Sequence, residues 1–443
     1  MSSSRIARLA ALQPAADTIR LPLGFTVSGV SAGVKKAKTA TPPLDLALFA
    51  SSAPCTAAAT FTTNLFAAAP VTLSKRLLDA AGHSGFRALA INAGNANACT
   101  GAQGEADARA MADAAAHAIG APSGTALIMS TGVIGTQLPV AKVTAGIAAA
   151  AGSLGSSGQH LVSAARAIMT TDTFPKYASR QYVLPASGTK YMLAGVCKGA
   201  GMIHPRMACH LPTNQGTMLG ALLTDAAIDP ALASVALDAA VDSSFNAVSV
   251  DGDTSTNDTV VLLANGMAAA PGSKPISRGG DDARAFQSHL AEFTRDLASR
   301  LVWDGEGATK FVAIRVRSHD RIVSKAIAES VATSPLVKTA FFGQDANWGR
   351  ILCAVGYTSL PAPDRAQLAP ETVSLSMRSR GGEIKLVERG VPRLPMDEAL
   401  AARILAEDEI DVDVDMGNGD QAATYFTCDF SHEYVSINAD YRS

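Results

Sequence analysis

The feature that most restricts the fold is a strand–turn–helix–strand pattern in the first half of the chain. An apolar run from Ala88 to Ile91 leads into the turn-prone segment NAGNANACTG. A helix is predicted next, because apolar residues recur at helical spacing until Gly120 and Pro122 end it. The run TALIMS follows as a buried strand. Buried strands that alternate with amphipathic helices need a sheet that helices cover.

The second half is richer in strands. Met267–Asp282 is predicted to be a surface loop, and Phe286–Leu301 an amphipathic helix. Phe311–Arg317 and Ile410–Asp415 alternate apolar with polar residues, as half-buried strands do. Because only the first half mixes helices and strands evenly, the predicted fold class is α+β, with layered sheets and helices. A length of 443 residues predicts two or more domains, or one elaborate domain.

Composition makes several functional classes improbable. The formal net charge is -2, which gives no reason to expect a nucleic-acid partner. No apolar run approaches the roughly 20 residues that cross a bilayer, so no membrane association is predicted. The six cysteines form no CxxC pair, and VDGDTSTNDT (Val250–Thr259) lacks the glycine and terminal glutamate of an EF-hand loop. We therefore expect neither a metal nor a resident cofactor.

The N-terminal segment has the composition of a mitochondrial transit peptide. It carries Arg5, Arg8 and Arg20 among serines and alanines, and its first acidic residue is Asp17. We assign residues 1–22 to this segment, which predicts the mitochondrial matrix as the location. The alternative is a frayed N-terminus of a protein that stays where it is made.

Four glycine-rich or polar segments carry candidate chemistry. STGVIG (Ser130–Gly135) follows a strand and can present backbone N–H groups to a developing negative charge, although alone it favours a tight turn. TTDTFPK (Thr170–Lys176) combines hydroxyls, a carboxylate and an amine, and in isolation it favours a solvated loop. Lys198 in CKGAGMIHP is suited to a substrate carboxylate, and Glu306 in DGEGATK to an ammonium group. The Walker pattern for phosphate is absent.

Acyl transfer needs a general base, and the sequence shows no motif of a Ser-His-Asp hydrolase that would supply a histidine for this role. The sequence contains neither HExxH nor a GxSxG elbow. A threonine at a newly made N-terminus supplies its own base, because its α-amino group can take the hydroxyl proton. The reference pKa of that amine is about 7.7–8.0, which suits general-base catalysis near neutral pH.

Taken together, the segments resemble the ornithine acetyltransferase family, the bifunctional glutamate N-acetyltransferases of arginine biosynthesis. The resemblance extends from about Gly24 to Ser443 and is closest to the fungal mitochondrial members. The matching segments stand in the family's order: TTNLFAAAPV, NAGNANACTG, STGVIG, TTDTFPK, KGAGMIHP, TMLGALLTDA, SVDGDTSTNDT, DGEGATKF, SPLVKTAFFGQDANWGRI and DFSHEYVSINADYRS. Each segment is weak alone, whereas the ordered set is specific.

The resemblance implies a self-processing, N-terminal-nucleophile-type acyltransferase of the ornithine acetyltransferase fold. The precursor cleaves itself before a threonine, and the two products remain together, commonly as an α2β2 heterotetramer. Here the α chain would be residues 23–216 and the β chain residues 217–443. The threonine takes acetyl from N-acetylornithine, releases ornithine and passes the acetyl group to glutamate. Many members also use acetyl-CoA as a donor.

The resemblance also implies roles for individual residues. Thr217 is the expected nucleophile, released by cleavage of the Gly216–Thr217 bond, and Thr131 and Gly132 form the expected oxyanion hole. The expected substrate-binding residues are Thr170 or Thr171, Lys198, Thr217, Glu306, Asn438 and Ser443. The last two predict that the C-terminal end is held beside the site.

The sequence departs from the family at the cleavage segment. The family continues from M-A directly into T-M-L, whereas here residues 209–216 (CHLPTNQG) intervene between Ala208 and Thr217. The motif TMLGALLTDA favours Thr217 as the nucleophile, and Cys209 is the alternative in the other alignment. Three hypotheses for the insert stay open: a tolerated loop, an inactivating insertion, or a short intron retained in the gene prediction.

Two other functions also stay open at this point. One is a self-cleaving aminopeptidase or amidohydrolase of the same fold, in which water replaces glutamate as acceptor. The other is an uncleaved, non-catalytic homologue that serves as a binding or structural partner. The aminopeptidase or amidohydrolase is disfavoured because the substrate-binding residues Lys198, Glu306 and Asn438 are all present.

Overall fold

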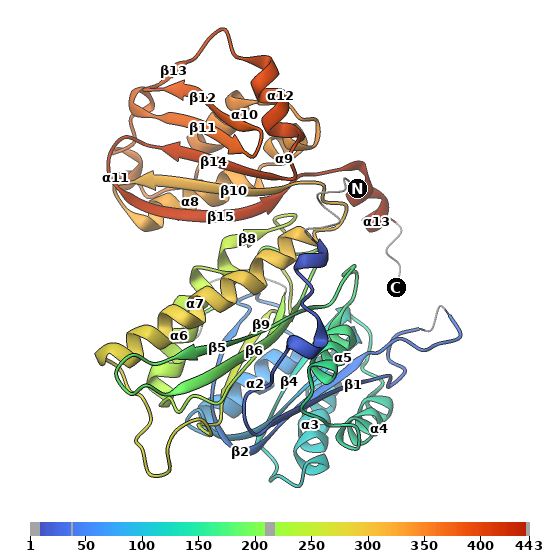
Figure 1. The fold of residues 1–443 in the computed structure, drawn as a ribbon. Coiled ribbons are helices and arrows are strands. Elements are labelled where there is room, and N and C mark those ends of the chain that lie inside the picture. Colours follow the sequence, from blue (N-terminus) through green and yellow to red (C-terminus); the bar gives the residue numbers. More distant parts are fainter. Residues whose placement is uncertain (1–8, 37–38, 209–217, 440–443) are drawn as a thin grey trace. The chain divides into compact units, whose positions relative to one another are not determined.

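The computed structural model describes residues 9–36, 39–208 and 218–439. The chain divides into a large unit, Ala10–Asn246 and Asp253–Leu301, and a small unit, Met1–Leu9, Ala247–Gly252 and Val302–Ser443. Each unit contains one mixed sheet and its own helices, which Figure 1 labels. The predicted α+β class with layered sheets and helices is confirmed.

The large unit is built on a sheet with strand order β4-β3-β2-β9-β7-β6-β5, and β1 pairs with β2 beside this path. The strands are β1 (Phe25–Val30), β2 (Leu46–Phe61), β3 (Ser84–Asn95), β4 (Ala126–Val133), β5 (Lys176–Val183), β6 (Lys190–Lys198), β7 (Leu219–Thr224) and β9 (Thr259–Ala264). The helices are η1 (Ala16–Thr18), α2 (Ala69–Ala80), α3 (Gly101–Ala118), α4 (Val140–Ala151), α5 (Gly158–Ile168), α6 (Pro230–Asp242), η2 (Phe245–Ala247) and α7 (Gly280–Trp303), the last two reaching one or two residues into the small unit.

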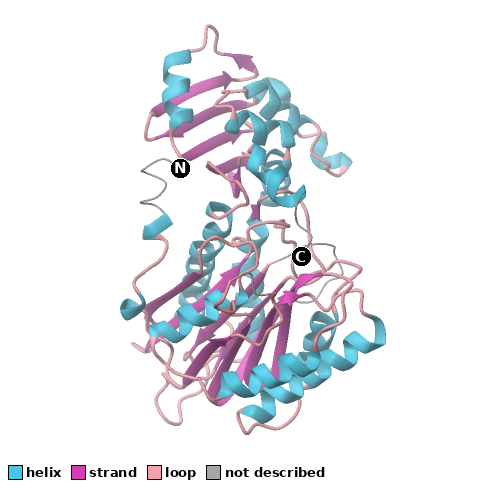
Figure 2. Cartoon of the chain, turned by 90° about the vertical axis from the view of Figure 1, so that its right-hand side faces the viewer, coloured by secondary structure: helices cyan, strands magenta, loops and turns pink. Residues whose placement is uncertain are grey.

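The central strands of this sheet are buried on both faces. All six residues of β7 and of β9 are buried, as expected for continuous apolar runs between two helical layers. On one face Leu219, Ala221 and Leu223 join the core that includes α5. On the other, the Cys197 thiol of β6 contacts the Leu297 carbonyl of α7 at 3.5 Å. Helices therefore cover both faces of the sheet (Figure 2).

The small unit has a sheet with strand order β13-β12-β11-β14-β10-β15-β8. The strands are β8 (Val248–Ser249), β10 (Phe311–Ser318), β11 (Ser374–Ser379), β12 (Gly382–Glu388), β13 (Val391–Pro392), β14 (Glu409–Asp415) and β15 (Gln421–Cys428). The helices are α8 (Arg321–Thr333), α9 (Pro335–Phe342), α10 (Trp348–Gly356), α11 (Ala362–Arg365), η3 (Pro370–Thr372), α12 (Glu398–Ala406) and α13 (His432–Ala439).

This second sheet buries only one face. Val312, Ile314 and Val316 of β10 are fully buried and share a core with α8 and α12. The residues of β10 between these three point away from that core. One of them, Arg317, forms an ion pair at 2.7 Å with Asp415 of the neighbouring parallel strand β14. A half-buried sheet requires the alternation that the sequence shows, and the two predicted strands correspond to β10 and β14.

The other predicted elements are also found. The expected strand–turn–helix–strand pattern corresponds to β3, α3 and β4, and the amphipathic helix lies within α7. The predicted surface loop is wrong only in its last three residues, because α7 begins at Gly280 and has Asp281 and Asp282 in its first turn. Carboxylates there stabilise a helix through its N-terminal dipole, which explains why this polar end of the loop is helical.

A test of the packing in the large unit is Gly29→Ala. A Cβ at Gly29 of β1 would lie 2.2 Å from the Ser163 carbonyl oxygen of α5, so strand and helix must separate. We expect the free energy of unfolding to fall by about 1–3 kcal/mol, measured by denaturant titration. Gly152→Ala is the control, because its φ is -69° and its Cβ would meet nothing closer than 3.6 Å. Equal effects of the two changes would contradict the packing described.

Candidate active site

The first candidate cluster lies at the end of the large sheet where β6 ends and β7 begins. Lys198, the last residue of β6, pairs with Leu219, and Leu219 pairs with Thr259 at the start of β9. The carbonyl of Met218 accepts a hydrogen bond from the Thr259 amide at 2.9 Å. The ladder therefore holds the residue that follows the predicted nucleophile between two strands.

The predicted oxyanion segment reaches the same cluster from β4. Thr131 is 3% exposed, and its hydroxyl accepts a hydrogen bond from the Lys198 ammonium at 3.4 Å. Gly132 has φ +132°, and a Cβ there would lie 2.3 Å from the carbonyl carbon of Gly94 in the parallel strand β3. This position consequently requires glycine. The sequence of Ser130–Gly135 taken alone predicts a tight turn. That prediction is wrong for Ser130 to Val133, because these residues continue strand β4.

Asn257 joins three of the sequence motifs. Its side-chain amide donates to the Ser130 carbonyl at 2.8 Å and to the Ala96 carbonyl at 2.7 Å. Ser130 in turn donates its hydroxyl proton to the Asn92 side chain at 2.5 Å. NAGNANACTG, STGVIG and TSTNDT are thus hydrogen-bonded to one another, although they are far apart in the sequence.

Asp172 is the charged centre of TTDTFPK, and the solvated loop favoured by this segment alone is wrong for Asp172 and Lys176. Lys176 is fully buried and its ammonium lies 2.6 Å from the carboxylate of Asp172. The amides of Gly199 and Thr170 donate to the same carboxylate at 2.7 and 2.9 Å. Burial opposes the charged form, but Lys176, Lys198 and these hydrogen bonds outweigh it and lower the pKa of Asp172 below its usual range. Thr170 and Thr171 themselves are half-buried.

Asp258 is buried at the same sheet end in a contrasting state. Its side chain is 0% exposed, and neither carboxyl oxygen has a hydrogen-bond partner among the described residues. Burial raises the pKa of Asp258 well above the usual value, and the charge of Lys198 offsets this only in part. Burial in such a place favours the neutral, protonated form of the carboxyl group over the charged form.

A second candidate pair lies within the small unit. The side-chain amide of Asn438, from α13, donates to the Glu306 carboxylate at 2.8 Å, and Glu306 is 8% exposed. The loop and the C-terminal segment are also joined where the Ser431 hydroxyl donates to the Gly307 carbonyl at 2.6 Å. The structure thus brings together two of the predicted substrate-binding residues and holds the chain as far as Asn438 against Glu306.

The remaining predicted residues fall outside the described part of the chain. These are Cys209, Gly216, Thr217 and Ser443. Sequence reasoning, in turn, missed Asp258, Asn257 and the pairing of Asp172 with Lys176 as parts of the cluster. The signal for them was their position inside motifs that had already been singled out.

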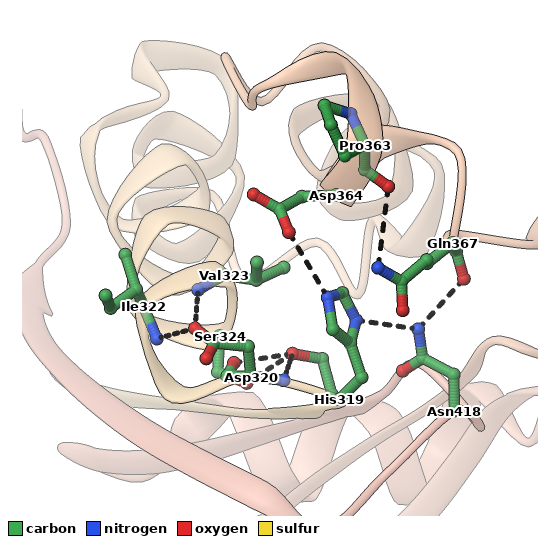
Figure 3. A network of polar contacts seen from close by, with 10 residues as sticks. His319, Asp320, Ile322, Val323, Ser324, Pro363, Asp364, Gln367 and Asn418 are labelled. Atoms are coloured by element: carbon green, nitrogen blue, oxygen red, sulfur yellow. Dashed lines mark hydrogen bonds and ion pairs between the residues drawn. The ribbon is translucent and has the colours of Figure 1, made fainter.

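Figure 3 shows another polar network, which lies in the small unit around His319. The His319 ring lies 3.5 Å from the Asp364 carboxylate and 3.2 Å from the Asn418 side chain. Ser324 is nearby but its hydroxyl donates to the Gln421 carbonyl at 2.7 Å. Asp320 accepts from the first amides of α8 as its N-cap. These contacts join α8, α11 and the loop before β15, so the network is a structural connection.

Two further observations concern the described residues alone. Within residues 9–36, 39–208 and 218–439, no group of three or more His, Cys, Asp and Glu side chains is arranged to hold a metal ion. In the same ranges no helix is both long and apolar enough to cross a membrane.

Comparison with known proteins gives a match over almost the whole chain. The model of the ArgJ family matches residues 26–443. The chain belongs to the ArgJ family. It is 49% identical over 431 residues to the mitochondrial arginine biosynthesis bifunctional protein ArgJ of Sordaria macrospora, covering 95% of this chain and 89% of that protein.

Two further relatives accompany this match. The mitochondrial arginine biosynthesis bifunctional protein ArgJ 1 of Botryotinia fuckeliana is 49% identical over 435 residues, covering 95% of this chain and 89% of that protein. A crystal structure of ornithine acetyltransferase from Mycobacterium tuberculosis, in complex with ornithine, is 38% identical with a TM-score of 0.38, and it covers 42% of this chain and 94% of that one. The resemblance inferred from the ordered motifs is confirmed.

The buried ion pair of this ArgJ chain gives a pH-dependent prediction. Asp172→Asn leaves the Lys176 ammonium buried without its charged partner, so we expect the free energy of unfolding at pH 7 to fall by about 3–5 kcal/mol. The folded-state pKa of Asp172 is lowered, so its stabilisation is present above the unfolded pKa of about 3.9 and is lost as pH falls through the folded value. The gap between variant and wild type should therefore narrow in acid.

The control for this prediction is an exposed ion pair in the same unit. Glu292 pairs with Arg180, and both side chains are about half exposed. Glu292→Gln should change the free energy of unfolding by no more than about 1 kcal/mol. Urea titrations at several pH values measure both variants. A loss for Asp172→Asn that does not depend on pH would refute the assignment of a lowered pKa.

Proposed function

We propose that this chain is an acetyltransferase of arginine biosynthesis that moves acetyl from N-acetylornithine to glutamate through an acetyl-threonine enzyme. The observation that carries the proposal is the match to bifunctional ArgJ proteins over 95% of the chain. The names of those relatives also support a mitochondrial location, which we assign to the matrix. Its substrates are small molecules, acetyl-CoA is a possible second donor, and no resident cofactor takes part.

We assign the acetyl-transfer chemistry to the large unit. The hydroxyl of Thr217 is the nucleophile, and the α-amino group exposed by cleavage takes its proton. Thr131 and Gly132 stabilise the oxyanion that forms on the acetyl carbonyl, supported by the rigid glycine-dependent contact between β3 and β4. Lys198 donates to Thr131, so its positive charge adds to the electrostatic stabilisation of that oxyanion. Thr170 and Thr171 bind substrate from the segment anchored by Asp172.

The charged residues that the resemblance implies for the amino-acid substrate lie one in each unit. Lys198 suits the substrate carboxylate, and Glu306 suits its ammonium group. Asn438 donates to Glu306 and thereby orients the carboxylate. We propose that Asn438 and Ser443 also bind the substrate. These residues contribute mainly by positioning the substrate, because none of them forms a covalent bond to the acetyl carbon.

Cleavage at Gly216–Thr217 would end the α chain at Gly216 and leave a β chain of residues 217–443. Strand β7 of the β chain is hydrogen-bonded to β6 of the α chain on one side and to β9 on the other. Strand β9 in turn pairs with β2 of the α chain. A cut before β7 breaks none of these ladders, so the products should stay associated, and we propose two copies of each in an α2β2 assembly.

The strand pairings also favour the first hypothesis for the insert. Ala208 pairs with Phe61, Phe61 pairs with Thr259, and Thr259 pairs with Leu219. Ala208 and Leu219 are thus three strand spacings apart, about 14 Å in a flat sheet. Three peptide units span at most about 11 Å, so a chain without the insert cannot occupy both positions before it is cut. Eight more residues remove that limit, which supports a tolerated loop.

The packing of the N-terminal residues favours a shorter transit segment than 1–22. Leu12 and Ile19 are buried, and the Tyr177 hydroxyl donates to the Pro14 carbonyl at 2.9 Å. The Leu12 carbonyl also accepts from the buried Arg300 at 2.8 Å. Removal of residues with these contacts would expose apolar surface of the large unit. We therefore propose that processing ends before Leu12.

The nucleophile is tested by Thr217→Ala. Without the hydroxyl neither peptide cleavage nor acyl transfer has an attacking group, so we expect one full-length band on a denaturing gel and no ornithine release. Wild type should give two bands, with Thr217 at one N-terminus by sequencing. Cys209→Ala is the matched variant and should behave as wild type. The reverse result, with Cys209→Ala inactive and Thr217→Ala active, would establish the other alignment.

The reaction class is tested by the dependence on glutamate. A transferase should release ornithine from N-acetylornithine continuously only when glutamate is present to take the acetyl group from the enzyme. Ornithine and N-acetylglutamate, measured by chromatography, should appear in equal amounts. Ornithine release at the same rate without glutamate would instead identify the hydrolase, which the family match does not favour. An uncut, inactive wild type would identify the non-catalytic homologue.

A further inference from the structure

Asn257 holds the segment that carries the expected oxyanion residues at both of its ends. Its side-chain nitrogen donates to the Ser130 carbonyl at 2.8 Å and to the Ala96 carbonyl at 2.7 Å. The Ala96 amide in turn donates to the Val133 carbonyl at 3.0 Å. Ser130 and Val133 flank the two expected oxyanion residues. One side-chain amide therefore closes a ring of hydrogen bonds around that pair.

This ring holds the backbone on which the oxyanion hole depends. Ser130 is 1% exposed, and because a peptide unit is planar, holding its carbonyl also holds the plane of the Thr131 amide. On the other side of Thr131, Gly132 lies against Gly94 with no room for a Cβ. Loss of the Asn257 donors would therefore disturb the two oxyanion residues directly.

The partners of Asn257 determine which way its amide faces. A carbonyl oxygen has no proton to donate, so only the side-chain nitrogen can lie against the Ser130 and Ala96 carbonyls. The Thr256 hydroxyl donates to the side-chain oxygen at 2.6 Å, which agrees with this orientation. Asn257 is 2% exposed, so water has little access to these groups. The position thus uses two N–H donors and one acceptor, a combination that aspartate, the isostere of asparagine, lacks.

Asn257 also connects this ring to the strand that follows the expected nucleophile. The Thr259 hydroxyl donates to the Asn257 carbonyl at 3.0 Å, and the Thr259 amide donates to the Met218 carbonyl at 2.9 Å. Met218 is the residue directly after Thr217 in the sequence. Hydrogen bonds and one short piece of backbone therefore lead from the second residue of the expected β chain to the oxyanion segment.

We propose that Asn257 is a positioning residue for acetyl transfer: its two N–H donors hold Thr131 and Gly132 at a fixed place relative to the nucleophile. Asn257 is given this role on the basis of the proposed acetyl transfer, and it acts through the oxyanion segment. An oxyanion forms when the threonine attacks the acetyl donor and again when glutamate attacks the acetyl-enzyme. The segment is therefore needed twice in each turnover.

The test is Asn257→Asp, which keeps the shape of the side chain and replaces its nitrogen by oxygen. Burial favours the protonated carboxyl, which has one O–H group where the amide has two N–H groups, so at least one carbonyl loses its donor. We expect kcat for ornithine release to fall by about 10- to 100-fold, as a small misplacement of oxyanion-stabilising groups does. KM for either substrate should change by less than about threefold, because both half-reactions are slowed alike and the bound substrates carry no oxyanion.

Asn265→Asp is the matched control. Asn265 follows the other end of β9 and is 9% exposed. It also uses its side-chain nitrogen twice, for the Leu23 carbonyl at 2.8 Å and the Ser51 hydroxyl at 3.2 Å. Both substitutions should lower the melting temperature, because each leaves a buried acceptor without its donor. Only Asn257→Asp should lower kcat, which is expressed per molecule of folded and cleaved enzyme.

Asn257→Ala covers the case in which Asn257→Asp does not fold. It removes both donors without adding an oxygen, and the same loss of kcat is expected. A folded and cleaved variant with wild-type kcat would overturn the inference. So would a fall in kcat for Asn265→Asp as large as that for Asn257→Asp. A folded variant that stays uncut on a denaturing gel would assign Asn257 to the cleavage step instead of acetyl transfer.

The rate of wild type separates this inference from the proposed function. If wild type transfers acetyl to glutamate and the Asn257 variants do so equally well, the inference fails and the proposed function stands. If wild type hydrolyses N-acetylornithine instead, the proposed function fails, but an oxyanion still forms and the same loss of kcat is expected of Asn257→Asp. A wild type without either activity would overturn both.

Discussion

The position of β7 between β6 and β9 is the constraint on which the rest of this molecule depends. The two ladders fix Met218 and Leu219 at the sheet end where Lys198 and Asp258 lie. They also join the two parts of the precursor, because β7 comes from one side of the expected cleavage bond and β6 from the other. A central strand buried on both faces is difficult to remove from a sheet, so cleavage beside it can release an amino group without releasing a chain.

The charges at this sheet end fall into two kinds. Asp172 is saturated by Lys176 and by backbone amides, and it anchors the segment that carries Thr170. Asp258 is buried as deeply but its oxygens lack such partners among the described residues. The first arrangement stabilises the fold and holds a loop. The second destabilises the fold, because a buried polar group without a hydrogen bond has lost its hydration and gained no partner. The same residue type at the same sheet end therefore calls for two different explanations.

The sequence predicted the architecture well because its elements follow periodicity. The half-buried strands β10 and β14 and helix α7 were all visible in the alternation of apolar residues. The site was predicted only in part. Ordered motifs pointed to Thr131 and Lys198, which the structure places in hydrogen-bond contact. The pairing of Asp172 with Lys176 lies in a non-helical segment, and the isolation of Asp258 depends on neighbours far away in the sequence. No local pattern distinguishes a saturated buried carboxylate from an unsatisfied one.

The insert before Thr217 changes the relation between folding and cleavage. In a chain without it, the short link between Ala208 and Leu219 cannot reach both of their strand partners, so an uncut precursor must leave one of these pairings unmade. Cleavage then allows the sheet to be completed. With eight additional residues both pairings form in the intact chain, and completing the sheet no longer favours the cut. The cleavage proposed above would therefore gain nothing from completing the sheet.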